Sequence, residues 1–239
     1  MAREKVFRFK QFAVLNDRTA MKVGTDGVLL GAWCPVEEAQ RVLDVGTGCG
    51  VIALMAAQRN PHAVVDAVDI DRDAVDEAAL NFSNSPWGDR LTAHLADFNA
   101  LPAELSSRRY DLIVSNPPYF DNGVLPDGAS RTQARHTLAL GYGQLIEGAA
   151  RRLTPDGILA LITPTDAEST VIQAAAFASL PVRRLTRVIP VEGAAPKRTL
   201  WLLSRRNMDY GEDTLTIAGK DGAFTAAYVA LTGAFYLKM

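Results

Sequence analysis

The residues with the clearest chemical potential form the tetrapeptide Asn116-Pro117-Pro118-Tyr119. A planar exocyclic amine is a poor nucleophile because its lone pair is delocalised. The Asn116 side-chain oxygen and the Pro117 carbonyl, placed by two prolines of fixed φ, could accept both N–H groups of such an amine. That pairing would aim the nitrogen lone pair at an electrophile without a base. Tyr119 supplies an aromatic face on which a flipped base can stack. The tetrapeptide therefore predicts group transfer to a planar nitrogen, whatever molecule carries it.

A glycine-rich turn, Asp44-Val45-Gly46-Thr47-Gly48-Cys49-Gly50, comes earlier in the chain. Glycines let a backbone bend sharply and approach a ligand closely. The dinucleotide pattern G-x-G-x-x-G holds a pyrophosphate on a helix N-terminus. The spacing here is G-x-G-x-G, with Asp44 two residues before Gly46. It favours S-adenosylmethionine (SAM), which has no phosphate, with S-adenosylhomocysteine as its product.

Two further acids stand where a nucleoside needs them. Asp69 ends a predicted strand, where a carboxylate can accept both ribose hydroxyls. Asp97 follows the next strand and could accept the adenine amine of SAM, with Phe98 beside the ring. For Asp69 two alternatives stay open: that Asp66 or Asp71 does the job, or that Asp69 only caps the next helix.

The elements that must position these residues alternate between strand and helix signals from Arg41 onward, which predicts parallel β-α-β units with right-handed crossovers. We expect a Rossmann-like α/β fold with helices on both faces of the sheet, and an antiparallel hairpin for the last two strands. The predicted strands are Arg41 to Val45, Ala63 to Asp69, Leu91 to Leu95, Tyr110 to Ser115, Ile158 to Thr163, Val182 to Ile189 and Leu200 to Ser204. The predicted helices are Val51 to Arg59, Arg72 to Phe82, Tyr142 to Leu153 and Val171 to Leu180.

The chain shows no internal repeat or long linker, so we expect one domain over residues 1–239. Residues 1–33 form an N-terminal extension, where Phe7, Phe9 and Phe12 predict a strand. Residues 34–206 form the core. Residues 207–239 form a tail in which aromatic residues at helical spacing predict a helix packed on that core.

Charge and composition bound the partners. The net charge is −2, yet residues 1–22 hold six bases against two acids, and residues 183–206 hold seven against one. Phosphate backbones respond to such local clusters rather than to net charge. The sequence has no apolar run long enough for a membrane span and no signal peptide at its start. Two cysteines and three dispersed histidines give no disulfide framework and no metal site. We expect a cytoplasmic protein without a metal.

With these motifs, the sequence resembles the class I SAM-dependent methyltransferases of the Asn-Pro-Pro-Tyr type, and among them the bacterial tRNA adenine-N6-methyltransferases. The resemblance covers nearly the whole chain. It is carried by the segments 9–12, 21–33, 85–87, 133–135 and 230–237, besides the two motifs already described.

The resemblance implies a seven-stranded, mostly parallel sheet with one antiparallel strand. It implies transfer of a methyl group from SAM to the N6 amine of an adenine in tRNA, namely adenine 37 of tRNA1(Val), by a monomer. It also implies that Thr25 and Asp26 help to close over SAM. By position and charge, we expect the tRNA contacts to be Arg131, Arg135, Lys197 and Arg198.

Rival interpretations remain. Glutamine N5-methyltransferases of release factors also use Asn-Pro-Pro-Tyr, but they carry a sizeable helical domain before the glycine turn. In this chain only about forty residues precede the turn, and their opening is basic and strand-like. Guanine N2-methyltransferases of ribosomal RNA tend to end the tetrapeptide in Phe and to have a duplicated domain. The glycine spacing disfavours a nicotinamide-dependent oxidoreductase, and the intact tetrapeptide disfavours a non-catalytic RNA-binding module.

Overall fold

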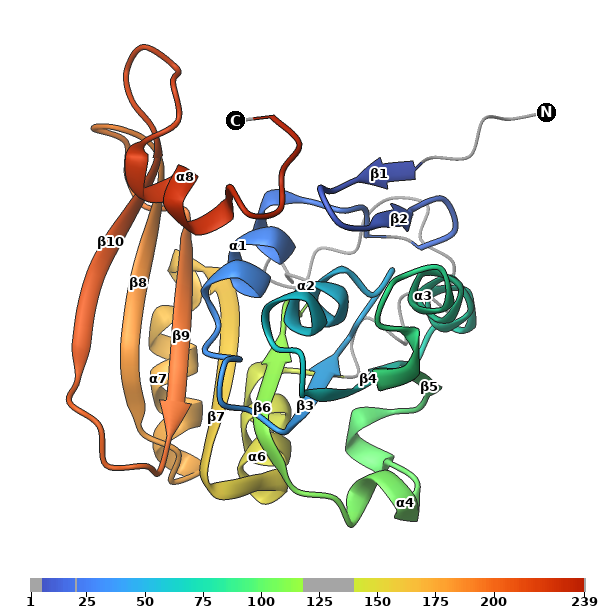
Figure 1. The fold of residues 1–239 in the computed structure, drawn as a ribbon. Helices are drawn as coiled ribbons and strands as arrows, with labels where there is room; N and C mark the ends of the chain where they lie inside the picture. Colours follow the sequence, from blue (N-terminus) through green and yellow to red (C-terminus); the bar gives the residue numbers. More distant parts are fainter. Residues whose placement is uncertain (1–5, 20, 118–139, 239) are drawn as a thin grey trace, which may run out of the picture.

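The computed structural model describes residues 6–19, 21–117 and 140–238, and in them the chain is built on one large twisted sheet (Figure 1). Its eight strands run in the order β10-β8-β9-β7-β6-β3-β4-β5. They are β3 (Arg41–Val45), β4 (Val64–Asp69), β5 (Leu91–Leu95), β6 (Tyr110–Ser115), β7 (Leu153–Pro164), β8 (Val182–Val191), β9 (Arg198–Ser204) and β10 (Gly211–Ala218).

All neighbouring strands in this sheet are parallel except at β9, which is antiparallel to both β7 and β8. The predicted hairpin of the last two core strands is thus confirmed. The chain leaves β3 towards β4 on one side and returns later as β6 on the other. Strand order therefore reverses beside β3, and in open α/β sheets ligands bind outside the carboxyl ends of the strands at such a point.

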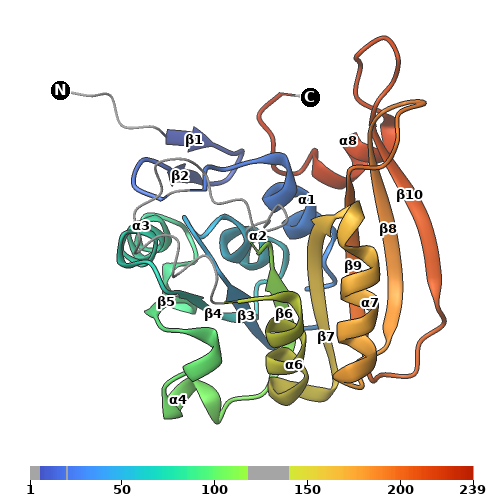
Figure 2. The ribbon, with the colours of Figure 1, turned by 180° about the vertical axis from the view of Figure 1, so that it is seen from behind.

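Helices cover both faces of the sheet (Figures 1 and 2). One face carries α1, α2 and α3, and its core includes Val42, Leu112 and Ile162; the other carries α6 and α7, and its core includes Leu43, Ile113 and Leu161. Successive residues of each strand thus face opposite cores, which is why the strands read as continuous apolar runs. The helices are α1 (Thr25–Trp33), α2 (Val51–Arg59), α3 (Arg72–Ser83), α4 (Ala103–Ser106), α6 (Tyr142–Arg152), α7 (Glu168–Phe177) and α8 (Ala226–Thr232), and the 3-10 turns are η1 (Gly88–Arg90), η2 (Phe98–Ala100) and η3 (Thr165–Ala167).

The N-terminal segment forms a small hairpin of β1 (Val6–Arg8) and β2 (Ala13–Leu15), which confirms the predicted strand character. Phe9 stacks on Phe12 with ring centroids 4.5 Å apart and forms a β-bridge with Tyr236 of the tail. The N–H of Lys10 donates to the carbonyl of Phe235 at 2.8 Å. The segment after β1 and the segment after α8 are therefore packed together, and α8 contacts α1 (Figure 1).

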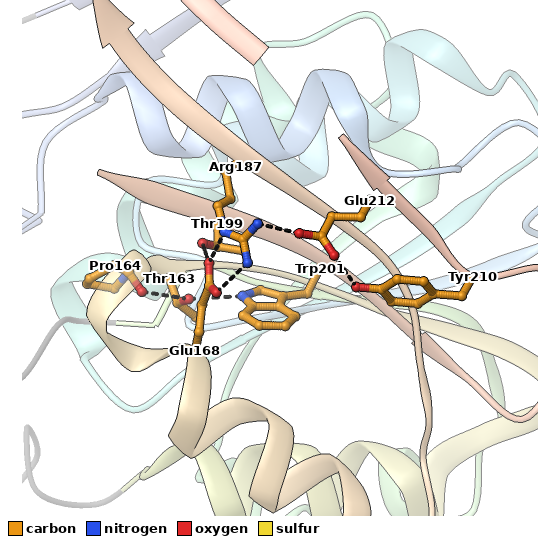
Figure 3. Close-up of polar contacts among 8 residues, drawn as sticks. All are labelled: Thr163, Pro164, Glu168, Arg187, Thr199, Trp201, Tyr210 and Glu212. Carbon is orange, nitrogen blue, oxygen red and sulfur yellow. Dashed lines mark hydrogen bonds and ion pairs between the residues drawn. The ribbon is translucent and has the colours of Figure 1, made fainter. Parts of the chain in front are cut away.

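A polar network joins the strands at the far end of the sheet (Figure 3). Arg187 on β8 donates from Nε and Nη2 to the two oxygens of Glu168 on α7, each at 2.8 Å. Thr199 on β9 donates to the same carboxylate at 2.7 Å. Arg187 also bonds Glu212 on β10, which accepts from the Tyr210 hydroxyl at 2.8 Å. Arg187 and Glu168 together thereby join one helix and three strands.

Two expectations need correction. The sheet has an eighth strand, β10, within the region expected to be only a tail, because its alternating polar residues resemble a surface segment. The predicted helix Val171 to Leu180 lies earlier, as α7, and ends before Ser179, which has a left-handed φ of 49°. Residues 154–157 lie inside β7, where the pairing with β6 shifts register. Among the described residues, no helix is long and apolar enough to cross a membrane.

Candidate active site

Three neighbouring strands end at one level and bring the predicted motifs together. Val45, the last residue of β3, pairs with Ser115 of β6 and with Val68 of β4. The Ser115 hydroxyl donates to the Val45 carbonyl at 2.8 Å, and both residues are buried. Gly46, the first glycine of the turn, directly follows Val45, and Asn116, the first residue of the tetrapeptide, directly follows Ser115. Gly46 and Asn116 are therefore neighbours at the carboxyl edge of the sheet.

The glycines of the turn have different reasons to be glycine. Gly46, Gly48 and Gly50 all have left-handed φ angles, of 71°, 55° and 83°. A Cβ at Gly46 or Gly48 would meet no atom within 4 Å, whereas one at Gly50 would lie 2.5 Å from the Phe82 ring. Gly50 thus allows α2 and α3 to pack closely, while the first two glycines leave an open backbone surface above the strands.

Asp44 lies beneath this turn and not on its surface. Its side chain is 0% exposed, and Oδ2 accepts from the Thr47 hydroxyl at 2.7 Å. Burial raises the pKa of the Asp44 carboxyl from 3.8 to about 7, against the lowering effect of the Thr47 hydroxyl. Asp44 therefore supports the turn through Thr47, and its predicted part in binding the cofactor stays a prediction.

Asp69 holds the turn from the neighbouring strand. Its Oδ2 accepts from the Gly48 N–H at 2.9 Å, and its Oδ1 accepts from the Asp71 N–H at 3.0 Å. Burial raises the pKa of the Asp69 carboxyl, and these N–H donors oppose the rise. Asp71 caps α3 by accepting from Asp73, and Asp66 is engaged by Arg108. Of the three acids, Asp69 is the one in contact with the glycine turn.

Asp97 and Phe98 follow β5 and behave differently. Asp97 is exposed, and its Oδ1 accepts from the Asn99 N–H at 2.8 Å, so that it caps η2. Phe98 is only 3% exposed; the Arg152 guanidinium lies 4.8 Å from its ring centroid, and Gly148 of α6 packs against it. The Phe98 ring therefore packs in the core, and its predicted place beside a cofactor ring stays a prediction.

The tetrapeptide is described only in its first half. Asn116 is half-buried and Pro117 is buried. The Asn116 Nδ2 donates to the Met21 sulfur at 3.9 Å, which directs the amide nitrogen towards the N-terminal segment. Pro118 and Tyr119, like the predicted tRNA contacts Arg131 and Arg135, lie outside the described residues.

Asp26, which is expected to help close over SAM, and Arg198, which is expected to contact tRNA, form an ion pair with each other. The Arg198 Nε donates to Asp26 Oδ2 at 2.8 Å and so joins the start of β9 to the first turn of α1, which begins at Thr25. Lys197, the neighbouring residue, is exposed. Arg198 thus already binds Asp26, and the predicted tRNA contacts at Lys197 and Arg198 stay predictions.

Sequence reasoning missed two buried polar residues of α3, Glu77 and Asn81, which bind the backbone of the N-terminal segment. A signal was available, because both lie at helical spacing with the apolar Ala74 and Ala78.

The residues present fit SAM. Two glycines present an open backbone surface, and a carboxylate at the next strand end lies where a ribose would rest. The exposed Asp97 follows the end of the third strand, β5. It lies next to Asp69, because the N–H of the preceding residue, Ala96, donates to the Asp69 carbonyl at 2.9 Å. Within the described ranges, no group of three or more His, Cys, Asp or Glu side chains could hold a metal ion.

This fold and this edge of the sheet define a SAM-dependent methyltransferase. Residues 22–184 match the family described as the methyltransferase small domain, and the chain belongs to that family. It is 42% identical over its full length to a protein of Enterobacter sp. strain 638 named tRNA1(Val) (adenine(37)-N6)-methyltransferase, of which the match covers 98%. A protein of the same name from Tolumonas auensis is 44% identical over 98% of this chain and 97% of its own length.

Solved structures agree on the fold. A predicted O-methyltransferase from Agrobacterium tumefaciens superposes with a TM-score of 0.70 over 88% of this chain and 96% of that one, at 20% sequence identity. At that identity, the likeness concerns the arrangement of strands and helices alone. The nicotinamide-dependent alternative is set aside by the family match and by the glycine spacing.

Proposed function

We propose that this protein transfers the methyl group of SAM to the exocyclic N6 amine of an adenine in tRNA, and that the adenine is A37 of tRNA1(Val). The observation that carries the proposal is the hydrogen bond from Ser115 to the Val45 carbonyl, which places Asn116 beside the glycine turn. The names of the relatives at 42% and 44% identity support the substrate.

In this proposal SAM supplies an electrophilic methyl group on its sulfonium, and the chain supplies orientation. Asp69 accepts the ribose hydroxyls, and Asp97 accepts the adenine amine of SAM. The Asn116 amide oxygen and the Pro117 carbonyl accept the two N–H groups of the target amine, so that its lone pair points at the methyl group. Both acceptors are neutral, so they orient the amine without removing a proton before attack.

Other parts of the proposal concern the target. Tyr119 stacks on the flipped adenine, and Arg131, Arg135 and Lys197 contact tRNA phosphates. A monomer suffices for this activity, because every named role falls on residues of one chain. We place the activity in the cytoplasm.

The experiment offers labelled SAM with two acceptors, total tRNA from a strain that lacks the enzyme and a release factor. Label is expected in the tRNA and not in the release factor. Label in the release factor alone would replace the proposal by glutamine methylation. Label in neither acceptor, from a protein that binds SAM by calorimetry, would point to another substrate, and ribosomal RNA would be offered next.

A further inference from the structure

The backbone that follows β2 crosses towards the active site, and α3 holds it there. Residues 15–19 and 21–26 are here called the strap, and β2, where the strap begins, contacts α3. Figure 1 shows this part of the chain above α2 and α3, on its way to α1.

The main anchor of the strap is the carboxylate of Glu77. Its Oε1 accepts from the N–H groups of Asp17 and Arg18 at 2.8 and 2.9 Å, and its Oε2 accepts from Thr19 at 3.2 Å. Three successive backbone N–H groups that converge on one anion form a concave nest. Glu77 is only 3% exposed. Although burial works in the opposite direction, these donors hold the pKa of Glu77 below its ordinary value.

Asn81, one helical turn further on, fixes the strap to the glycine turn. Its Oδ1 accepts from the Leu15 N–H at 2.8 Å, and its Nδ2 donates to the carbonyls of Leu15 and Cys49 at 3.0 and 2.8 Å. The start of the strap, α3 and the SAM turn are thus one connected unit.

The strap also contacts Asn116, through the side chain of Met21. The Thr19 hydroxyl donates to the Met21 carbonyl at 3.2 Å, and the Met21 sulfur accepts from Asn116 Nδ2 at 3.9 Å. The Lys22 ammonium closes the loop by donating to the carbonyls of Asp17 and Thr19 at 2.9 and 2.8 Å. A continuous series of contacts therefore runs from the Glu77 carboxylate to the Asn116 amide.

We infer that Glu77 is a positioning residue for methyl transfer: by holding residues 17–19, it places Met21 against Asn116 and so orients the amide that receives the target amine. The inference rests on the proposed role of Asn116. Glu77 touches neither substrate nor cofactor and acts through the strap alone.

The test is a double-mutant cycle with the full chain, SAM and tRNA. In Glu77→Gln one acceptor oxygen becomes a donor, and the nest loses its charge. Met21→Leu removes the sulfur acceptor from a side chain that is 45% exposed, so the fold tolerates it. We expect kcat to fall about tenfold in Glu77→Gln, since small misplacements near the reacting atoms cost rate steeply, and about threefold in Met21→Leu. KM for tRNA and Kd for SAM should stay within about twofold.

The double variant decides the matter. If Glu77 acts through Met21, Met21→Leu changes kcat by less than about twofold once Glu77 has been replaced. Effects that multiply independently, or an unchanged kcat in Glu77→Gln, would overturn the inference. If Glu77→Gln does not fold, Thr19→Val serves instead, because it removes only the hydroxyl link to Met21. It should lower kcat about threefold, and an unchanged kcat would overturn the inference equally.

Glu168→Gln is the matched control. Glu168 is another helix-borne acid that accepts several hydrogen bonds, but its partners are Arg187 and Thr199. Its replacement should lower the melting temperature and leave kcat unchanged. A wild type that methylates no tRNA would instead refute the proposed function itself, and the cycle would then be read with the true substrate.

Discussion

The two halves of the sheet are built for different purposes. The half formed by β6, β3, β4 and β5 has strands of five or six residues. β3 leads into the left-handed glycines, β4 ends at the half-buried Asp69, and the exposed Asp97 lies two residues beyond β5. The half formed by β7, β9, β8 and β10 has strands of seven to twelve residues, joined by the Glu168–Arg187–Glu212 network.

The difference teaches where polar groups are used. In the long-strand half, the charged side chains of Glu168, Arg187 and Glu212 bind one another and join neighbouring elements. In the short-strand half, Asp69, Asn81 and Glu77 hold backbone N–H or carbonyl groups and thereby shape loops at the site. Changes in the Glu168–Arg187–Glu212 network should therefore alter stability, and changes at the loop-holding residues should alter chemistry.

The largest effect is expected at Asn116. Asn116→Ala removes a fixed acceptor and should lower kcat by about 100-fold to 1,000-fold, the usual cost of losing one oriented polar group in an active site. SAM affinity, measured by calorimetry, should be unchanged. A variant that loses SAM binding in proportion to its activity would place Asn116 in the cofactor site instead.

In the long-strand half, Glu168→Gln should destabilise the fold by about 1–2 kcal/mol, since Arg187 and Thr199 lose a charged acceptor. The Arg187 guanidinium lowers the pKa of Glu168, so its stabilising contribution is present above the ordinary pKa of 4.5 and is lost as pH falls through the lower folded value. Urea unfolding of both proteins at pH 7 and pH 3 tests this, and the gap should shrink in acid. An equal gap at both pH values would contradict the assigned cause.

At the cofactor edge, Asp69→Ala and Asp71→Ala form a matched pair. Asp69→Ala should weaken SAM binding by about tenfold or more, because the Gly48 N–H and a ribose would lose their acceptor. Asp71→Ala removes the cap of α3 and should cost about 1 kcal/mol of stability with little effect on SAM affinity. Calorimetry and thermal unfolding separate the two. If Asp71→Ala weakened SAM binding more than Asp69→Ala did, Asp71 and not Asp69 would be the residue that binds the ribose.

The smallest effect concerns the two neighbouring cations at the start of β9. Lys197→Ala should raise KM for tRNA by about threefold and reduce its salt dependence, as expected when one phosphate contact is lost. Arg198→Ala should also weaken SAM binding, because it releases Asp26 on α1. Identical behaviour of the two variants would mean that the Arg198–Asp26 pair has no bearing on the cofactor.

Much of the fold could be predicted from the sequence because its strands are apolar on both faces and its turns carry Gly or Pro. The strands ending at Val45, Asp69, Leu95 and Ser115 end where periodicity indicated. β10 could not be predicted in this way, since its acids Glu212 and Asp213 form ion pairs with Arg187 and Arg184, which are 25 and 29 residues away in the sequence.

The candidate site, like the fold, could be predicted only in part from the sequence. Local motifs identified the glycine turn and Asn116, because their spacing carries the chemistry. The supporting roles of Asp44 and Phe98 could not be read from spacing, since burial depends on the strands and helices packed around them. Glu77 and Arg198 act on segments about 60 and 170 residues away along the chain, so their partners became known only from the structure.

The most direct test of the central claim is to map the modified nucleotide. tRNA1(Val) from a strain lacking the enzyme is treated with the protein and SAM, digested, and analysed by mass spectrometry. The account predicts one added methyl group on the N6 amine of adenine 37, absent with Asn116→Ala. A methyl group on a guanine, on a ring nitrogen of adenine or on a ribose would contradict it.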